Sequence, residues 1–261
     1  LCEQFIAHAF AITWARVCPR HSAGHRMVFV DSGANEGTWS VLAAAWGCHS
    51  LAVEPQSACV EWIKDAARHN RVADRVEARL AFLGPPQEAR PFGHGACRRT
   101  FDGSSPQKHL RMNQSLVPTM PLSKMLRPSD IVALWHVDLE GAESGVLLSS
   151  GDLLSARRVQ RVMVELSPQQ WPRPREDVVR KLATLFGGWT CVVACSGRPF
   201  RWEEARGGRP RGTCSDRWRL QRKARSAGSK GGCLSQISDV YCVAPTLAHD
   251  DPALQMLTSK D

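Results

Sequence analysis

The feature that most constrains the fold is a series of short apolar segments that each end in, or just before, a carboxylate residue. Four such segments lead to Asp31, Glu54, Asp138 and Glu165. They alternate with stretches of helical pattern, which predicts parallel strands joined by helices. Because ligands bind beyond the carboxyl ends of strands in an open sheet of this kind, we expect these acids to line a binding site.

The same alternation predicts seven strands and four helices. We expect strands at residues 27–31, 50–53, 76–82, 131–137, 159–166, 189–194 and 236–244, and helices at 38–46, 57–70, 142–154 and 175–186. Ser57 stands where the second helix would have its N-cap. The predicted fold is therefore α/β and Rossmann-like, with a seven-stranded, mostly parallel sheet whose last strand is antiparallel.

The chain length of 261 residues suits one domain. We expect an N-terminal helical segment (1–26), the main domain (27–245) with loop insertions at about 84–117 and 196–232, and a C-terminal loop-like tail (246–261). The longest apolar stretch is interrupted by polar residues, so no membrane span is expected. The chain begins at Leu1 rather than Met, as a processed product or a fragment would, and we expect a cytoplasmic protein.

The formal net charge of +9 is concentrated in one segment. Residues 196–232 hold eleven Lys and Arg residues against three acids, so the rest of the chain is nearly neutral.

The ten cysteines form no C-x-x-C pair, which gives no indication of structural zinc. Cys48 and Cys191 lie in apolar stretches, where we expect buried free thiols.

A glycine-containing turn after the first predicted strand and Glu54 after the second indicate an adenosine-type cofactor. Gly33 and Gly37 permit unusual backbone dihedrals, and the Glu54 carboxylate can accept hydrogen bonds from both ribose hydroxyls. Glu36 would repel a pyrophosphate but is compatible with a sulfonium, which favours S-adenosylmethionine over a dinucleotide; an ordinary tight turn is the alternative. The predicted cofactor-binding residues are Asp31, Gly33, Ala34, Asn35, Gly37, Glu54, Pro55 and Asp138.

Four motifs in this order resemble the FkbM-type methyltransferases: Val-Asp-Ser-Gly-Ala-Asn-Glu-Gly (30–37), Ala-Val-Glu-Pro (52–55), Val-Asp-Leu-Glu-Gly-Ala-Glu (137–143) and Val-Met-Val-Glu-Leu (162–166). The resemblance implies a class I methyltransferase fold, S-adenosylmethionine as methyl donor, and transfer to a hydroxyl oxygen of a small molecule or sugar. This sequence departs from the family pattern at Ser123, where an acid is usual, and at His136, where a lysine is common.

A neutral hydroxyl needs a general base for methyl transfer, and the candidate catalytic residues are Asp138, Glu140 and His136. We favour Asp138 or Glu140, since both lie at or just past a strand end. As alternatives, Glu140 could cap the next helix, Glu143 could be a first-turn acid, and His136 could be a hydrogen-bonded core residue. Asp138, Glu140 and Glu165 have no clear fourth partner, so no metal site is predicted.

Two other functions stay open from the sequence. An RNA-modifying methyltransferase could use the basic segment 196–232, with Trp202 and Trp218 stacking on bases, although a solvated insertion has the same composition. A protein of the same fold could also bind without catalysis. We expect residues 84–117 to cover the pocket, Trp39 and Trp46 to pack in the core, and Trp171, Trp202 and Trp218 to be available for stacking.

Overall fold

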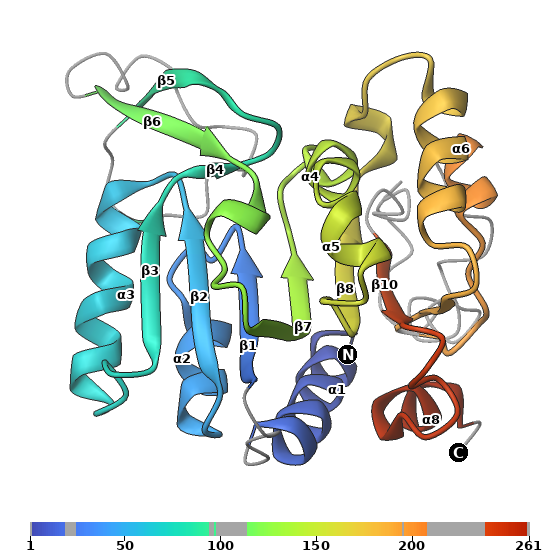
Figure 1. Cartoon of the computed structure of the whole chain (residues 1–261), viewed down its shortest axis with the longest axis horizontal. Coiled ribbons are helices and arrows are strands. Elements are labelled where there is room, and N and C mark those ends of the chain that lie inside the picture. The colour runs from blue at the N-terminus through green and yellow to red at the C-terminus, as the bar shows by residue number, and fades with distance from the viewer. Residues whose placement is uncertain are drawn as a thin grey trace, which may run out of the picture.

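The computed structural model describes residues 2–18, 25–93, 97, 114–194, 196–207 and 238–259. Its main sheet has seven strands in the order β3-β2-β1-β7-β8-β10-β9 (Figure 1). Their bounds are β1 Arg26–Ser32, β2 His49–Glu54, β3 Val76–Leu80, β7 Asp130–Val137, β8 Arg161–Leu166, β9 Thr190–Val193 and β10 Ser238–Val243. The strands from β3 to β8 are parallel, whereas β10 pairs antiparallel with both β8 and β9. The predicted sheet is confirmed.

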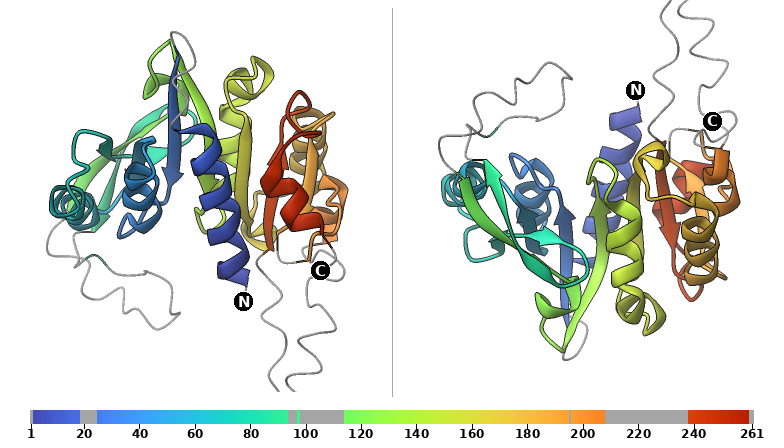
Figure 2. Two further views of the ribbon diagram at one scale, coloured as in Figure 1. Left: turned by 90° about the horizontal axis from the view of Figure 1, so that it is seen from below. Right: turned by 90° about the horizontal axis from the view of Figure 1, so that it is seen from above.

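Helices cover both faces of this sheet (Figure 2). One face carries α1 Cys2–Val17, α2 Thr38–Ala45, α3 Ser57–His69 and α8 Pro252–Thr258, and the other carries α4 Glu143–Ser149, α5 Gly151–Ser155 and α6 Arg175–Leu185. Because both faces are covered, all side chains of β7 except that of Ile131 are buried. This accounts for the continuous apolar run that the sequence shows there.

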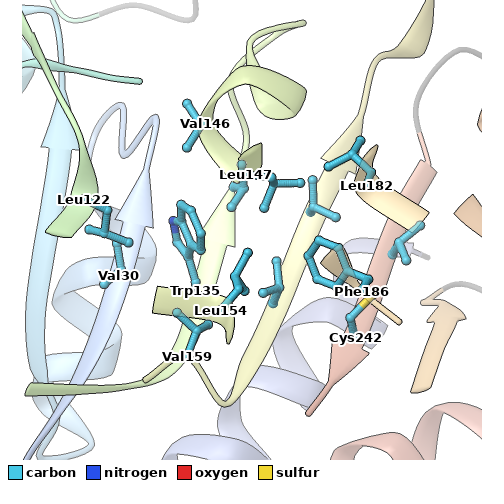
Figure 3. Packing of buried hydrophobic residues seen from close by; sticks show 14 of the residues in the cluster. Val30, Leu122, Trp135, Val146, Leu147, Leu154, Val159, Leu182, Phe186 and Cys242 are labelled. Carbon is cyan, nitrogen blue, oxygen red and sulfur yellow. The ribbon is translucent and has the colours of Figure 1, made fainter. Parts of the chain in front are cut away.

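The larger core cluster fills the space between the sheet and α4 to α6. Figure 3 shows Val30, Trp135 and Leu147 in this cluster. Trp135 is fully buried, and its indole Nε1 donates a hydrogen bond of 2.7 Å to Oγ of Ser32 on the neighbouring strand. The second cluster lies under α1 and α8, where the ring of Phe10 packs on those of Trp14, Phe29 and Trp39.

A second, three-stranded sheet corrects the prediction of a loop over residues 84–117. Its strands are β4 Phe82–Leu83, β5 Gln87–Gly93 and β6 Gln114–Met120, in the order β4-β6-β5. The strand predicted at 76–82 is therefore divided, with β3 in the main sheet and β4 in the small one. Phe82 and Phe92 make an edge-to-face contact in the small sheet, and β4 pairs with the distant β6, which local sequence patterns do not reveal.

Three helical predictions also need correction. The helix expected at 142–154 is two short helices, α4 and α5, joined at Ser150. Ser57 is the first helical residue of α3 and Gln56 is its N-cap, without a side-chain cap bond. The loop-like tail contains α8, which packs against α1 through Ala253, Leu254 and Leu257.

The prediction of free thiols at Cys48 and Cys191 is wrong. Cys48 forms a disulfide with Cys18, and Cys191 forms one with Cys242 across β9 and β10. A third disulfide joins Cys59 of α3 to Cys97. The partners lie 30 to 51 residues apart in the sequence, so only the tertiary structure identifies the pairs.

The tryptophans are also distributed differently from the prediction. Trp39 packs partly buried against the second core cluster, but Trp46 is 46% exposed. Trp171 and Trp202, expected in loops and available for stacking, are buried. Trp218 lies outside the described residues.

Within the described ranges, no helix has the length and apolarity needed to cross a membrane.

Candidate cofactor and active site

The turn between β1 and α2 adopts backbone conformations that only certain residues tolerate. Gly33, Asn35 and Gly37 all have positive φ angles, of 79°, 49° and 74°. A Cβ atom on Gly33 would overlap the carbonyl oxygen of Asp138. The glycine therefore lets the β1 turn lie directly against the residue that follows β7, which closes one side of the site.

Glu54 ends β2 and is held beside this turn. Its Oε2 accepts a hydrogen bond of 2.9 Å from the backbone N–H of Asn35, and its Oε1 accepts one of 3.0 Å from that of Gln56. The side chain is only 3% exposed, and burial raises its pKa although both backbone bonds act in the opposite direction. Each carboxylate oxygen can accept a further hydrogen bond, so the group can still bind the hydroxyl groups of a ligand.

Asp31 and His136 form a buried pair across β1 and β7. His136 Nδ1 lies 2.9 Å from Oδ1 of Asp31, whose Oδ2 accepts a hydrogen bond of 2.7 Å from Ser40. The ring of His136 is in edge contact with those of Phe10 and Trp39, on the face that α1 covers. This placement favours the interpretation of His136 as a hydrogen-bonded core residue.

Burial lowers the pKa of His136, but the hydrogen bond with Asp31 and the nearby carboxylates outweigh it and the net effect is a raised pKa. The imidazole lies beneath the acidic rim of the sheet and carries a positive charge when it is protonated. It therefore compensates part of the negative charge that Asp31 and Asp138 bring there.

Four acids gather at the ends of β7, β8 and β10: Asp138, Glu140, Glu165 and Asp239. Asp239 faces Glu165 in the register of β10 and β8, and Glu165 is hydrogen-bonded to Asp138. Burial together with the charges of Asp138 and Asp239 raises the pKa of Glu165 to about 9. Glu165 therefore holds its proton at neutral pH and donates a hydrogen bond to Asp138.

Glu140 and Glu143 share a motif but have different surroundings. Glu140 has a positive φ of 49° in the turn after β7, and partial burial and Asp138 raise its pKa. Glu143 is fully buried, and its carboxylate accepts hydrogen bonds from the backbone N–H of Gly141 (2.5 Å) and from Nε1 of Trp171 (2.9 Å). It therefore fixes the shape of the turn that presents Asp138 and Glu140, which is more than a first-turn acid would do.

A cavity of about 420 Å³ lies between α3, β3 and the segment after β6. Val60 and Lys64 of α3, Leu80 and Ala81 at the end of β3, and Met120 and Met125 are among its lining residues. It reaches Ser57, three residues after Glu54, but no residue predicted for the cofactor or catalysis lines it. In the described part of the chain, no cluster of three or more possible metal ligands occurs.

The strand order, with the antiparallel β10 inserted between β8 and β9, and the acidic strand ends define a class I methyltransferase fold. The family model described as the methyltransferase FkbM domain matches residues 31–188. The chain therefore belongs to the FkbM methyltransferase family, which confirms the resemblance seen in the sequence.

The chain is also similar, at low sequence identity, to several solved structures. The N-terminal domain of human METTL16 in complex with SAH is 11% identical, with a TM-score of 0.42 over 94% of this chain and 70% of that chain. WbdD, in co-crystals with a kinase inhibitor, is 12% identical, with a TM-score of 0.44 over 92% of this chain and 40% of that chain. No curated protein sequence matches the chain.

Several contacts of the site were not foreseen from the sequence. They are the amide of Asn35 on Glu54, the contact of Trp171 with Glu143, and the approach of Asp239 to Glu165. Asp239 directly precedes an apolar run, whereas the other acids follow one. This position beside a predicted strand was the local sequence signal that could have identified it. The other two contacts join segments whose proximity depends on the folded sheet.

Proposed function

We propose that this methyltransferase transfers the methyl group of S-adenosylmethionine to a hydroxyl oxygen of a small molecule or sugar. The observation that carries the cofactor assignment is Glu54, which ends β2 and is oriented by the amides of Asn35 and Gln56. A carboxylate fixed in this way can accept hydrogen bonds from two vicinal ribose hydroxyls. Asp31, Gly33, Ala34, Asn35, Gly37, Pro55 and Asp138 would complete the cofactor site.

The charge of the rim suits this cofactor. When bound, S-adenosylmethionine supplies an electrophilic methyl group on a positively charged sulfur. Burial is the largest cause of the raised pKa of Glu165, and the charges of Asp138, Asp239 and Glu140 raise it further, so these carboxylates are close enough to repel one another. A positive group placed near them relieves that repulsion, whereas a pyrophosphate would increase it.

Asp138 is the general base we favour for the acceptor hydroxyl. It lies at the end of β7, its backbone N–H is bonded to the carbonyl of Ser32, and it receives the hydrogen bond of Glu165. That hydrogen bond orients the carboxylate, which keeps acceptor capacity for the hydroxyl proton as the O–C bond to the acceptor forms and the S–C bond of the donor breaks. Glu140, two residues further on, is the second candidate. His136 is the weakest of the three, because it is buried and paired with Asp31.

Calorimetry with S-adenosylhomocysteine on the native protein and on Glu54→Ala tests the cofactor assignment. Loss of two charge-assisted hydrogen bonds should weaken binding by about 2 kcal/mol, or roughly thirtyfold. Glu61→Ala is the matched control, because Glu61 lies on α3, the helix that follows Glu54, and is exposed and paired with Lys64. Equal affinity of Glu54→Ala and the native protein would contradict the assignment, and cofactor binding without transfer to any hydroxyl acceptor would favour a non-catalytic binding protein.

The described residues do not support the RNA-modifying alternative. Trp202, one of its two proposed stacking residues, is stacked on Phe186 in the protein core at a centroid distance of 4.7 Å. Trp218 and most of the basic segment lie outside the described residues. We therefore keep a small-molecule or sugar hydroxyl as the proposed acceptor.

The disulfides bear on where the reaction takes place. Three of them form among the described cysteines, and structural disulfides are typical of oxidising compartments and rare in the cytosol. In place of the cytoplasmic location expected from the sequence, we propose that the protein meets its acceptor in an oxidising compartment. Peptide mapping of the native protein without reductant tests this, since free thiols at all six positions would contradict it.

A further inference from the structure

The Cys59–Cys97 disulfide differs from the other two in its position. Cys59 is fully buried in α3, the helix that follows Glu54, whereas Cys97 belongs to the insertion between β5 and β6. The bond therefore ties the insertion to the helix that begins beside the proposed cofactor site. Cys191–Cys242, by contrast, joins β9 and β10, at the far end of the main sheet from β3.

Both sulfur atoms of this disulfide lie against one side chain of the cofactor turn. Oδ1 of Asn35 is 3.8 Å from Sγ of Cys59 and 3.7 Å from Sγ of Cys97. Disulfide sulfurs carry no proton, so these are packing contacts and not hydrogen bonds. The Asn35 side chain is thus held from one side by the disulfide.

The backbone of the same residue holds Glu54. Asn35 has a left-handed conformation, with φ of 49°, and in it the N–H points at Oε2 of Glu54. A left-handed conformation is uncommon for a residue with a side chain, and although Asn adopts it more readily than most residues, the packing of the disulfide on the Asn35 side chain helps to hold it here. Removal of the packing on Asn35 frees this residue to leave that conformation and to release Glu54.

We infer that the Cys59–Cys97 disulfide is a positioning element of the cofactor site, which fixes Asn35 and through it Glu54, so that cofactor affinity depends on the intact bond. This inference rests on the proposed function. It assigns no contact with the cofactor to either sulfur. The gain in affinity comes from the preorganisation of the turn, because a turn that is already ordered loses less entropy when a ligand binds.

The test compares two double variants, each without one disulfide. In Cys59→Ala/Cys97→Ala, we expect binding of S-adenosylhomocysteine to weaken by about tenfold, measured calorimetrically well below the melting temperature. In the control Cys191→Ala/Cys242→Ala, which also loses a disulfide but far from the turn, affinity should stay within about twofold of the native value. The single variant Cys97→Ala, which leaves the buried Cys59 in place, serves if the first double variant does not fold.

Amide hydrogen exchange gives a readout that does not depend on the cofactor. Without ligand, deuterium uptake at residues 33–37 should rise in Cys59→Ala/Cys97→Ala and stay native in the control. The inference is overturned if the native protein binds S-adenosylhomocysteine and the Cys59→Ala/Cys97→Ala variant has equal affinity and unchanged exchange. That outcome leaves the proposed function intact. A native protein that does not bind the cofactor product overturns the proposed function and, with it, the inference.

Discussion

Nδ1 of His136 lies 2.9 Å from Oδ1 of Asp31, so side chains as well as backbone join β7 to β1 at the centre of the sheet. Both residues are buried, and Ser40 of α2 bonds to the other oxygen of Asp31. One carboxylate thus connects two strands and a helix just before the turn formed by residues 33–37. The more distant of its two partners, His136, lies 105 residues from Asp31 in the sequence.

The first prediction concerns this pair. His136→Leu leaves the Asp31 carboxylate buried without its imidazole partner, so the free energy of unfolding should fall by about 3 kcal/mol, measured by urea denaturation. The raised pKa of His136 adds a pH dependence. The extra stability is fully present below its unfolded-state pKa of about 6.5 and is lost as the pH rises through the folded-state pKa.

The difference between native protein and His136→Leu should therefore be larger at acidic than at alkaline pH. The double variant Asp31→Asn/His136→Leu is the control, because it removes the unpaired charge and should recover part of the loss. A pH-independent difference would show that the histidine is neutral in the folded protein.

The second prediction concerns protons at the rim. Because the pKa of Glu165 is raised to about 9, this group is protonated in the free protein at pH 7.5. The positive sulfur of S-adenosylmethionine lowers that pKa, so its binding should release protons and strengthen as the pH rises toward 9. Calorimetry in buffers of different ionisation enthalpy measures the release.

S-adenosylhomocysteine, whose sulfur is uncharged, should release fewer protons in the same experiment. Glu165→Gln is the control variant, since it keeps the size of the side chain but has no carboxyl proton, and it should abolish the difference between the two ligands. Equal proton release by both ligands would contradict the placement of the sulfur near these acids.

The third prediction separates steric from backbone effects at two glycines. In Gly33→Ala, the new methyl group meets the carbonyl oxygen of Asp138, so either the turn or the end of β7 must move. Gly47 also has a positive φ, of 95°, but nothing lies within 4 Å of a Cβ there.

Gly47→Ala should therefore cost only the backbone strain, about 1 kcal/mol, whereas Gly33→Ala should cost more than twice as much and also weaken cofactor binding. Thermal denaturation with and without S-adenosylhomocysteine measures both effects. Similar losses in the two variants would show that the turn has room to adapt.

The fourth prediction concerns the C-terminal helix. Asp251 is the N-cap of α8 and accepts a hydrogen bond of 2.8 Å from the backbone N–H of Leu254. It also bonds to Tyr241 (3.2 Å) and forms a buried ion pair with Arg161 of β8 (2.5 Å). Asp251→Ala leaves a buried guanidinium without its carboxylate, and the free energy of unfolding should fall by about 3 to 5 kcal/mol.

Asp250→Ala is the matched control for this variant. Asp250 is the neighbouring residue, is exposed, and contacts Arg16 only through its backbone carbonyl. Its substitution should change the stability by less than about 0.5 kcal/mol. Equal denaturation midpoints of the two variants would show that the contacts of the Asp251 side chain do not stabilise the fold.

The sequence alone determined the strands of the main sheet and the acids that stand at the strand ends. Strands such as β7 are buried on both faces, so their apolar runs are long enough to recognise, and the acid that follows marks the strand end. The turn from Gly33 to Gly37 and the residue Glu54 could be located for the same reason, because strand, turn and acid are neighbours along the chain. The family match over residues 31–188 covers this part of the molecule.

Only the tertiary structure decided which side chains meet. Cys48 and Cys191 looked like free thiols because a disulfide partner 30 or 51 residues away leaves no local pattern. His136 looked like a candidate base, but its position within β7 places it beside Asp31 and under α1. Periodicity is a property of neighbouring residues, whereas pairing across a sheet depends on which strands lie side by side, and that order is set when the whole chain buries its core.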